Sequence, residues 1–522
     1  MYSMSTWIVF PNQIFPLEKI KSFLEKYKIK QIILLEHPIY FGKDSERLIP
    51  MNKLKLILHR ACFYFYKDYL ESKNFKVRHI KVNEYVLETL VLPESKVYYI
   101  DVPDYLLDKR MKEALPSIER LDEHPNYYLN RQDIEDFFDS RKGKKRTQHD
   151  DYYRWTRKRF NILMDNGKPE GGLLSYDKYN RSPPPSTKIQ FPELPTIDSE
   201  SQVYVERAKK EIEKEFPDNP GTLDFYLPIT FRGAQKWFDS FLKERLLKFG
   251  KYEDAVVQGE PFMYHGVLSP LLNCGLLDPV KVCHFAEEAY YHIKKPEPLQ
   301  ASRVRFDFVA DKSSTDNSVI GFEEPLHSVE GFIRQILGWR EWQRIQYLTN
   351  YKKLINGNYY NNNNTLNKKW WSGELGVKPI DDTIKMGFKY GYLHHILRLM
   401  YMSNFMNLCR IQPDEMYRWF MSFPMDSYDW VMIQNVYSMG AGMNMTKPYI
   451  TTGNYIVKMS DYKKDKEWTG LWEALYYCFL EDNEEKLMAF PRVGGIMRKN
   501  LHRKSPAQME AYREMMNHFM GK

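Results

Sequence analysis

Two adjacent histidines and an arginine lie inside an apolar stretch in the C-terminal half of the chain. The stretch reads GFKYGYLHHILRLMYMSNF over residues 387–405. Its apolar residues recur at the spacing of a buried helix, so the sequence predicts one continuous helix over this range. His394 and His395 precede Arg398 by four and three residues. A single helix would therefore turn all three side chains toward one face.

The three residue types suit proton transfer beside a bound anion. Histidine gains and loses a proton near neutral pH, which suits a general acid or base. A buried arginine requires a carboxylate or another anionic oxygen, and Asp426 and Asp429 in the following MDSYDW are candidates. The alternative is structural: the histidines pack in the core and Arg398 makes an ordinary ion pair.

Length and composition indicate what class of protein the chain is and how many domains it has. The chain has 522 residues, of which 43% are hydrophobic and 28% charged, which is typical of a globular protein with two to four domains. Its net charge of +8 permits a polyanionic partner. The five cysteines include no CxxC pair, so we predict no disulfide framework and no metal site. No apolar run spans a bilayer and the N-terminus lacks a signal-peptide layout, so we expect a soluble intracellular monomer, its compartment left open.

Residues 1–135 alternate between strand and helix signals. TWIVF, QIILLE, KVRHIKV and KVYYIDV are short β-rich runs, and residues 51–71 read as a helix between two of them. This alternation predicts a Rossmann-like α/β domain with a parallel sheet. No GxGxxG follows the first strand, which excludes an ordinary dinucleotide site. Asn12 and Glu36 follow strands, where ligands of such sheets bind; a solvated strand end is the alternative for Glu36.

Residues 136–200 form a basic segment followed by a linker. The run RKGKKRTQHDDYYRWTRKRF (141–160) interleaves basic and aromatic residues. Such a run meets phosphates by charge and bases by stacking, and a solvated helix face explains it equally well. Residues 201–522 show helical periodicity almost throughout and predict a large all-α domain.

Four stretches of the helical half resemble the photolyase/cryptochrome family. They are FGKYEDAVVQGEPFMYHGVLSPLLNCGLLDP (249–279), EEPLHSVEGFIRQILGWREW (323–342), YLHHILRLM (392–400) and MTKPYITTGNYIVKMSDY (445–462). The similarity is greatest to the prokaryotic (6-4) photolyase branch, which usually carries an iron–sulfur cluster, and it extends over nearly the whole chain. It implies the photolyase fold, with an α/β N-terminal domain and an all-α FAD-binding domain.

The resemblance implies blue-light-driven, FAD-dependent repair of UV pyrimidine dimers in DNA, with (6-4) photoproducts as the expected lesion. A cryptochrome-like light receptor that binds FAD without repair is the first alternative. A helical nucleic-acid-binding protein without flavin is the second. CPD lesions as substrate stay open.

The resemblance also assigns roles residue by residue. His395 is the implied proton donor, and His394 supports it. The implied electron path uses Trp419 next to the flavin, Trp371 at the surface and Tyr428 between them, while Phe420 stands where close relatives have tyrosine. The implied lesion and DNA contacts are Arg181, Lys447 and Tyr449. The implied FAD-binding residues are Tyr252, His265, Gly266, Leu268, Ser269, Trp339, Arg340, Arg398, Asp426 and Met432.

The HGVLSP segment is compatible with phosphate binding on physical grounds as well. It places Gly266 and Ser269 in a turn that opens a helix, where backbone N–H groups and a hydroxyl suit a pyrophosphate. An ordinary capped helix is the alternative.

Three positions or sets of positions depart from the family pattern. The four positions of the cluster cysteines read Pro379, Lys463, Lys466 and Gly470, so we predict no iron–sulfur cluster. Met432 stands where the branch has a glutamate facing the flavin N5, and a thioether is a poor hydrogen-bonding partner there. This favours the receptor alternative. A lumazine-type antenna near Asn12 and Glu36 stays open, because asparagine replaces the usual acidic residue.

Overall fold

The computed structural model describes residues 5–86, 96–143, 148–185, 190–294, 323–443 and 447–521. The chain divides into two compact units. Unit 1 comprises residues 1–181, 190–253 and 264–345, and unit 2 comprises 182–189, 254–263 and 346–522. The domain limits expected from the sequence, near residues 135 and 200, do not coincide with these borders, so that three-part division stays a prediction.

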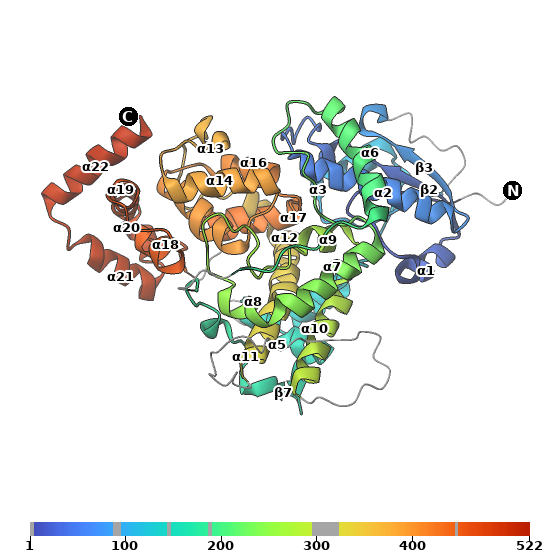
Figure 1. The fold of residues 1–522 in the computed structure, drawn as a ribbon, viewed down its shortest axis with the longest axis horizontal. Coiled ribbons are helices and arrows are strands. Elements are labelled where there is room, and N and C mark those ends of the chain that lie inside the picture. The colour runs from blue at the N-terminus through green and yellow to red at the C-terminus, as the bar shows by residue number, and fades with distance from the viewer. Residues whose placement is uncertain are drawn as a thin grey trace. The chain divides into compact units, whose positions relative to one another are not determined.

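A parallel five-stranded sheet forms the N-terminal part of unit 1 (Figure 1). Its strand order is β3-β2-β1-β4-β5, with β1 (Ser5–Val9) paired to β2 (Ile29–Leu35) and β4 (Lys96–Ile100). β3 (Lys76–Ile80) and β5 (Glu119–Leu121) form the edges. The four predicted strands and the α/β fold class are confirmed. β5 was not predicted, because its three residues carry no β-rich signal.

The sheet reverses its order beside β1, since β2 and β3 lie on one side and β4 and β5 on the other. In open parallel sheets, ligands bind at this reversal, outside the carboxyl ends of the strands. β1 is buried at every position, and Trp7, Ile33 and Tyr99 of the three central strands are at 0% exposure. The predicted helix over residues 51–71 is confirmed as α2 (Lys53–Glu71), which packs on β3 and on α6 (Ser199–Glu215).

Unit 1 also has a two-stranded antiparallel sheet of β6 (Met164–Asp165) and β7 (Lys168–Pro169), and helices predominate in the rest of both units. The other α-helices of unit 1 are α1 (Leu17–Lys26), α3 (Tyr105–Ala114), α4 (Arg131–Asp139), α5 (His149–Phe160), α7 (Phe231–Glu244), α8 (Leu246–Tyr252), α9 (Ser269–Cys274), α10 (Pro279–Lys294) and α11 (Glu323–Ile333), continued by the π-helix η6 (Arg334–Arg340) and by α12 (Glu341–Ile355), whose C-terminal part belongs to unit 2. Unit 2 contains α13 (Lys369–Ser372), α14 (Lys378–Tyr390), the π-helix η7 (Leu397–Ser403), α15 (Asn404–Leu408), α16 (Pro413–Ser422), α17 (Asp429–Ile433), the π-helix η8 (Gln434–Gly440), α18 (Gly453–Met459), α19 (Lys466–Asp482), α20 (Glu484–Leu487), α21 (Pro491–Leu501) and α22 (Pro506–Met520). Among the described residues, none of these helices has the length and apolar character needed to cross a membrane.

The continuous helix predicted over residues 387–405 is wrong. α14 ends at Tyr390, and Gly391 follows with a left-handed φ of 57°. Residues 392–394 are not helical, and a new helical segment starts at His395 and continues into η7 and α15. The physical reason is the glycine: a left-handed residue after the last turn satisfies the free carbonyl groups and stops the helix. The apolar spacing continues across this break and conceals it.

Candidate functional site

Within unit 2, the helical segment that starts at His395 carries a buried ion pair. Arg398 Nη2 lies 2.9 Å from Asp426 Oδ2, and the two side chains are only 15% and 7% exposed. Arg398 Nε also donates to the Leu393 carbonyl at 2.6 Å, which fixes the guanidinium beside the break after α14. The predicted Arg398–Asp426 pairing is therefore present. Its position beside a flavin ring stays a prediction.

The two histidines do not converge on one face with Arg398, as the continuous helix had implied. His394 precedes the helical segment and is buried, with 2% exposure, whereas His395 begins the segment and is exposed. His395 is thus open to solvent and His394 lies in the interior, and the roles of both histidines stay predictions.

Asp429, the other candidate partner of Arg398, has hydrogen bonds of its own. Tyr347 donates its hydroxyl to one carboxylate oxygen at 2.5 Å, and Tyr417 donates to the other at 2.5 Å. All three residues belong to unit 2. Asp429 is 2% exposed, so these bonds provide the compensation that a buried carboxylate requires.

The predicted electron-path tryptophans both contact one phenylalanine. Phe388 of α14 lies 5.9 Å from Trp419 and 5.9 Å from Trp371, measured between ring centroids. Trp419 is fully buried and donates its indole N–H to the Trp370 carbonyl at 2.9 Å, whereas Trp371 is half-buried. Tyr428 is buried at the start of α17. Phe388 thus lies against both tryptophans, and the electron path through them stays a prediction.

Of the remaining predicted site residues of unit 2, Met432 lies in the interior, whereas Lys447 and Tyr449 lie at or near the surface. Met432 is in α17 and is 1% exposed, so its thioether belongs to the interior. Lys447 is exposed, and its ammonium lies 5.3 Å from the ring centroid of half-buried Tyr449. Residues 445 and 446 of the same predicted loop lie outside the described residues.

Within unit 1, the HGVLSP segment forms the predicted turn before a helix. His265 is 7% exposed, and its Nε2 lies 3.2 Å from the Glu253 carbonyl. The Gly266 carbonyl accepts a hydrogen bond from Trp237 at 2.9 Å, and Ser269 starts α9, with buried Leu268 before it. α9 is only six residues long. Phosphate binding by this turn stays a prediction.

Three predicted FAD residues of unit 1 have aromatic or polar partners in the same unit. Tyr252 stacks on Tyr264 at 5.6 Å between centroids. Trp339 stacks on His149 at 3.8 Å with an interplanar angle of 7°. Arg340, 9% exposed, donates to the Asn126 carbonyl at 2.9 Å and to Asn273 Oδ1 at 3.2 Å. Trp339 and Arg340 therefore hold α5, the loop around Asn126 and α9 together.

Arg181, the predicted DNA contact of unit 1, is exposed and pairs with Asp177. Residues shortly before it in the sequence form a stack of three rings with His327, which is 4.6 Å from Tyr176 and 4.6 Å from Tyr179 between ring centroids.

The basic run around α5 is largely occupied by internal contacts. Arg157 is 1% exposed and donates to the Ile162, Leu163 and Leu174 carbonyls, while Arg159 pairs with Asp133. Residues 144–147 lie outside the described residues. The part of the run that the structure describes thus supports folding of unit 1 more than phosphate contact.

Glu36, a predicted antenna residue, is the centre of a buried ion-pair network. Arg60 contacts it through two hydrogen bonds of 2.9 and 2.7 Å, the Val82 N–H donates at 3.1 Å, and His79 Nε2 lies 3.2 Å away. The alternative of a solvated strand end is wrong, because Glu36 is 0% exposed. Its oxygens are engaged by the protein itself. Asn12, 7% exposed, follows β1 as expected.

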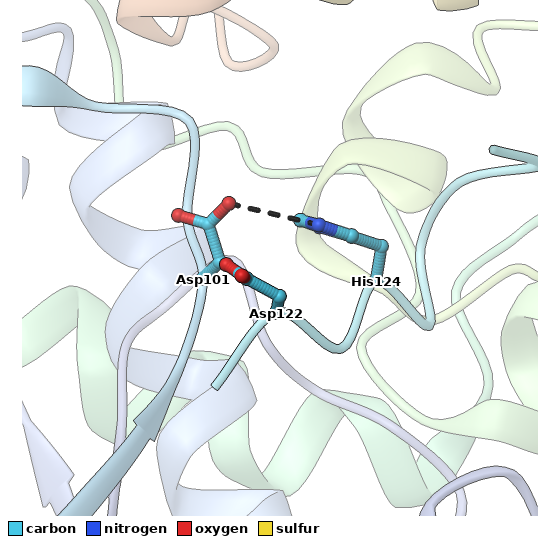
Figure 2. Close-up of side chains that lie close together, drawn as sticks. All are labelled: Asp101, Asp122 and His124. Atoms are coloured by element: carbon cyan, nitrogen blue, oxygen red, sulfur yellow. Dashed lines mark ion pairs between the residues drawn. The ribbon is translucent and has the colours of Figure 1, made fainter. Parts of the chain in front are cut away.

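The sequence reasoning missed one group of residues with metal-binding chemistry. Asp101, Asp122 and His124 follow β4 and β5, and one ligand atom from each lies within 4.8 Å of the other two (Figure 2). The three residues are scattered over 24 positions of sequence, and the strand that brings them together was not predicted.

Comparison with known proteins connects these observations. A family model described as "Deoxyribodipyrimidine photo-lyase-related protein" matches residues 7–226. A "(6-4) photolyase" of Agrobacterium fabrum is 32% identical over 365 residues, which is 67% of this chain and 66% of that protein. The chain belongs to the photolyase/cryptochrome family. Two solved structures of photolyase/cryptochrome proteins also match, each over 98% of this chain. A bacterial class III photolyase from Agrobacterium tumefaciens has a TM-score of 0.50 at 15% identity, with 98% of this chain and 92% of that chain covered.

A second solved structure, of a cryptochrome, also matches nearly the whole chain. The cryptochrome of Synechocystis sp. PCC6803 matches with a TM-score of 0.52 at 13% identity, covering 98% of this chain and 93% of that chain. At these identities the two structures show the fold alone. The photolyase/cryptochrome fold class expected from the sequence is thus confirmed, and the roles of individual residues stay predictions. All five cysteines are free and buried, and the absence of an iron–sulfur cluster also stays a prediction.

Proposed function

We propose that this member of the photolyase/cryptochrome family is a blue-light-driven, FAD-dependent DNA photolyase, with (6-4) photoproducts as its lesion. The observation that carries the proposal is the exposed His395 at the start of the helical segment that bears the buried Arg398–Asp426 pair. A proton donor must reach the substrate, and the ion pair anchors its helix three residues further on. The 32% identity to a protein named (6-4) photolyase supports the same lesion.

The chain offers the groups that a flavin requires. In unit 2, Arg398 supplies N–H donors, Asp426 a carboxylate, and Met432 an apolar surface, all within a largely buried environment. In unit 1, the predicted FAD contacts are Tyr252, His265, Gly266, Leu268, Ser269, Trp339 and Arg340. FAD, when bound and reduced, supplies the electron that cleaves the lesion.

The protein's own residues would hold the lesion and move a proton. His395 donates a proton to the lesion's hydroxyl-bearing pyrimidine and recovers it after the hydroxyl has moved. Lys447 and Tyr449 in unit 2, and Arg181 in unit 1, provide the charge and stacking surfaces that an extruded base needs. His394 supports the loop before His395 from the core.

Repair of a defined lesion tests the proposal. Flavin-loaded protein is illuminated with blue light in the presence of an oligonucleotide that carries one (6-4) photoproduct, and the repaired strand is quantified. We expect repair by the natural chain and a loss of about 100-fold or more in His395→Asn, since general acid catalysis contributes this much. The matched control His502→Asn replaces an exposed histidine of unit 2 that pairs with Glu484 and should repair normally. Equal rates in all three proteins, or no repair by any of them, would overturn the proposal.

A light receptor of the cryptochrome type is the second candidate, and buried Met432 favours it. A thioether in the interior offers no firm hydrogen bond to a flavin nitrogen, which would alter the flavin's redox behaviour. The receptor predicts a bleaching flavin without repair and equal affinity for damaged and undamaged DNA.

A further inference from the structure

The carboxyl ends of β4 and β5 bring three metal-ligand side chains together in unit 1. Ile100 of β4 pairs with Leu121 of β5 in a parallel register. Asp101 follows the first strand directly, and Asp122 and His124 follow the second. Figure 2 shows the His124 ring directed at the Asp101 carboxylate, with Asp122 beside them. One oxygen of each aspartate and one ring nitrogen of the histidine all lie within 4.8 Å of one another.

His124 is a buried polar side chain without a hydrogen bond. Its side chain is 2% exposed, and within the part of the chain that the structure describes neither ring nitrogen has a hydrogen-bond partner. The Asp101 oxygen is 3.7 Å from Nε2, too far for a hydrogen bond. A buried group left unsatisfied costs about 1–3 kcal/mol, so the arrangement requires an explanation. A metal ion between the ring and the carboxylates provides one.

Both carboxylates and arginines surround the three residues, and Arg344 acts on His124 and Asp101 besides Arg131 and Arg120. A hollow of about 530 Å³ opens beside them, and both Asp122 and His124 line it. Its charged lining consists of one arginine, Arg131, and four carboxylates. These carboxylates belong to Asp122, Glu123, Asp133 and Glu135. The hollow gives an ion a route from solvent and leaves room for water on its open side.

Arg131 lies where a cation would be placed. Its Nη2 is 2.7 Å from Asp101 Oδ2 and its Nε is 3.2 Å from Asp122 Oδ1, so it bridges the two carboxylates. The Arg131 side chain is 34% exposed and lines the hollow, which leaves it space to turn away. Arg120 is 3.8 Å from both aspartates and stays further from the centre. A bound ion would therefore compete with Arg131.

We propose that Asp101, Asp122 and His124 bind a divalent transition-metal ion, with Zn²⁺ as the best match, and that the ion replaces Arg131 between the two carboxylates. One imidazole nitrogen and two carboxylate oxygens are a ligand set that Zn²⁺ accepts, and three protein ligands leave a position open to water. The site is independent of the proposed flavin chemistry. It differs from the prediction of no metal site, which rested on cysteine spacing and could not detect ligands brought together by strand order.

Metal titration of the full-length protein tests the site. The protein is stripped with a chelator and titrated with Co²⁺, whose visible absorption reports its coordination, and Zn²⁺ is then added as competitor. We expect one Co²⁺ per chain, displaced by Zn²⁺. His124→Gln and Asp122→Asn should each weaken binding by more than about tenfold, since even supporting groups of metal sites contribute that much.

Two further variants separate a built site from general charge attraction. Glu123→Gln removes the same charge as Asp122→Asn from the same hollow and should leave the affinity within about twofold. Arg131→Gln removes the competing cation and should tighten binding, an effect that misfolding would not produce. The proposal is overturned if the natural chain binds no Co²⁺ at micromolar concentration, if His124→Gln binds as the natural chain does, or if Arg131→Gln weakens binding.

Discussion

His394 and His395 are neighbours in the sequence, yet one is 2% exposed and the other is exposed. The difference follows from the end of α14 at Tyr390, after which His394 lies in a short non-helical link and His395 begins the next helical segment. The two adjacent histidines thus differ in their environment: His394 is a buried side chain and His395 is open to solvent.

The two histidines should separate stability from activity. His394→Ala removes a buried side chain and should lower the free energy of unfolding by about 1–3 kcal/mol. His395→Ala should change it by less than about 0.5 kcal/mol, as exposed positions do, while it removes the proposed proton donor. Thermal unfolding of both variants, followed by circular dichroism, measures the difference. Equal destabilisation would mean that His395 is a packing residue as well.

Glu36 should make the protein sensitive to acid. Burial raises the pKa of Glu36, but the contacts with His79 and Arg60 outweigh it and lower the pKa from 4.5 to about 2. The folded state therefore favours the ionised form, and this stabilisation is complete above pH 4.5 and is lost as the pH falls from there to about 2. Glu36→Gln should cost about 3 kcal/mol at pH 7, the lower end for a broken buried pair, because Arg60 keeps Glu215.

The pH dependence provides the check. Unfolding temperatures of the natural chain and Glu36→Gln should differ most at neutral pH and converge below pH 4.5. Glu25→Gln is the control: Glu25 forms an exposed pair with Lys21 at 3.9 Å, so the variant should unfold like the natural chain at every pH. A gap that stays constant down to pH 3 would show that ionisation of Glu36 does not stabilise the fold.

Gly391 should be required for the break between α14 and the segment of His395. Its φ of 57° is left-handed, where an alanine costs about 1–2 kcal/mol. Gly391→Ala should therefore destabilise unit 2 by this amount. Gly470 is the matched control: it lies inside α19, a Cβ there would meet nothing within 4 Å, and Gly470→Ala should stabilise by about 0.5–1 kcal/mol. Chemical denaturation of both variants gives the two opposite shifts, and a neutral Gly391→Ala would contradict the assigned backbone.

Most of the secondary-structure elements discussed here could be predicted from local sequence patterns. The first four strands and α2 are visible as β-rich runs and apolar spacing, because each depends on its own residues. The helix end at Tyr390 was missed although its signal was present: Gly391 has the position of a helix-terminating glycine, but the apolar spacing continued past it. β5 was missed because Glu119–Leu121 contains only one buried residue, Leu121.

The sites depend on contacts that no local pattern records. The pairing of Arg398 with Asp426 could be predicted, because family motifs placed both residues. The environment of Glu36 could not, since Arg60 and His79 come from other elements. The same holds for Asp101 and His124, which meet only because β5 adds to the sheet beside β4.

Electron transfer to a bound flavin should depend on both tryptophans that contact Phe388. Under the proposed function, Trp419→Phe should abolish photoreduction and Trp371→Phe should slow it, because the buried ring lies at one end of the array and the half-buried ring at the other. Phe388→Tyr introduces an oxidisable ring against both and should accelerate photoreduction. The decay of flavin absorption under blue light with a thiol reductant measures all three. Unchanged rates in Trp371→Phe would place the path elsewhere.

The Arg398–Asp426 pair should couple flavin retention to the stability of unit 2. Asp426→Asn leaves a guanidinium of 15% exposure without its carboxylate, and breaking such a pair costs about 3–5 kcal/mol. Arg398→Met with Asp426→Leu removes both charges and should recover most of that loss, since apolar replacements of buried pairs are often neutral. Flavin content per chain, read from absorption, should fall in both proteins if the pair binds the cofactor. If the double variant regains stability and also keeps its flavin, the pair is a structural anchor of the His395 helix and the flavin is held by other groups.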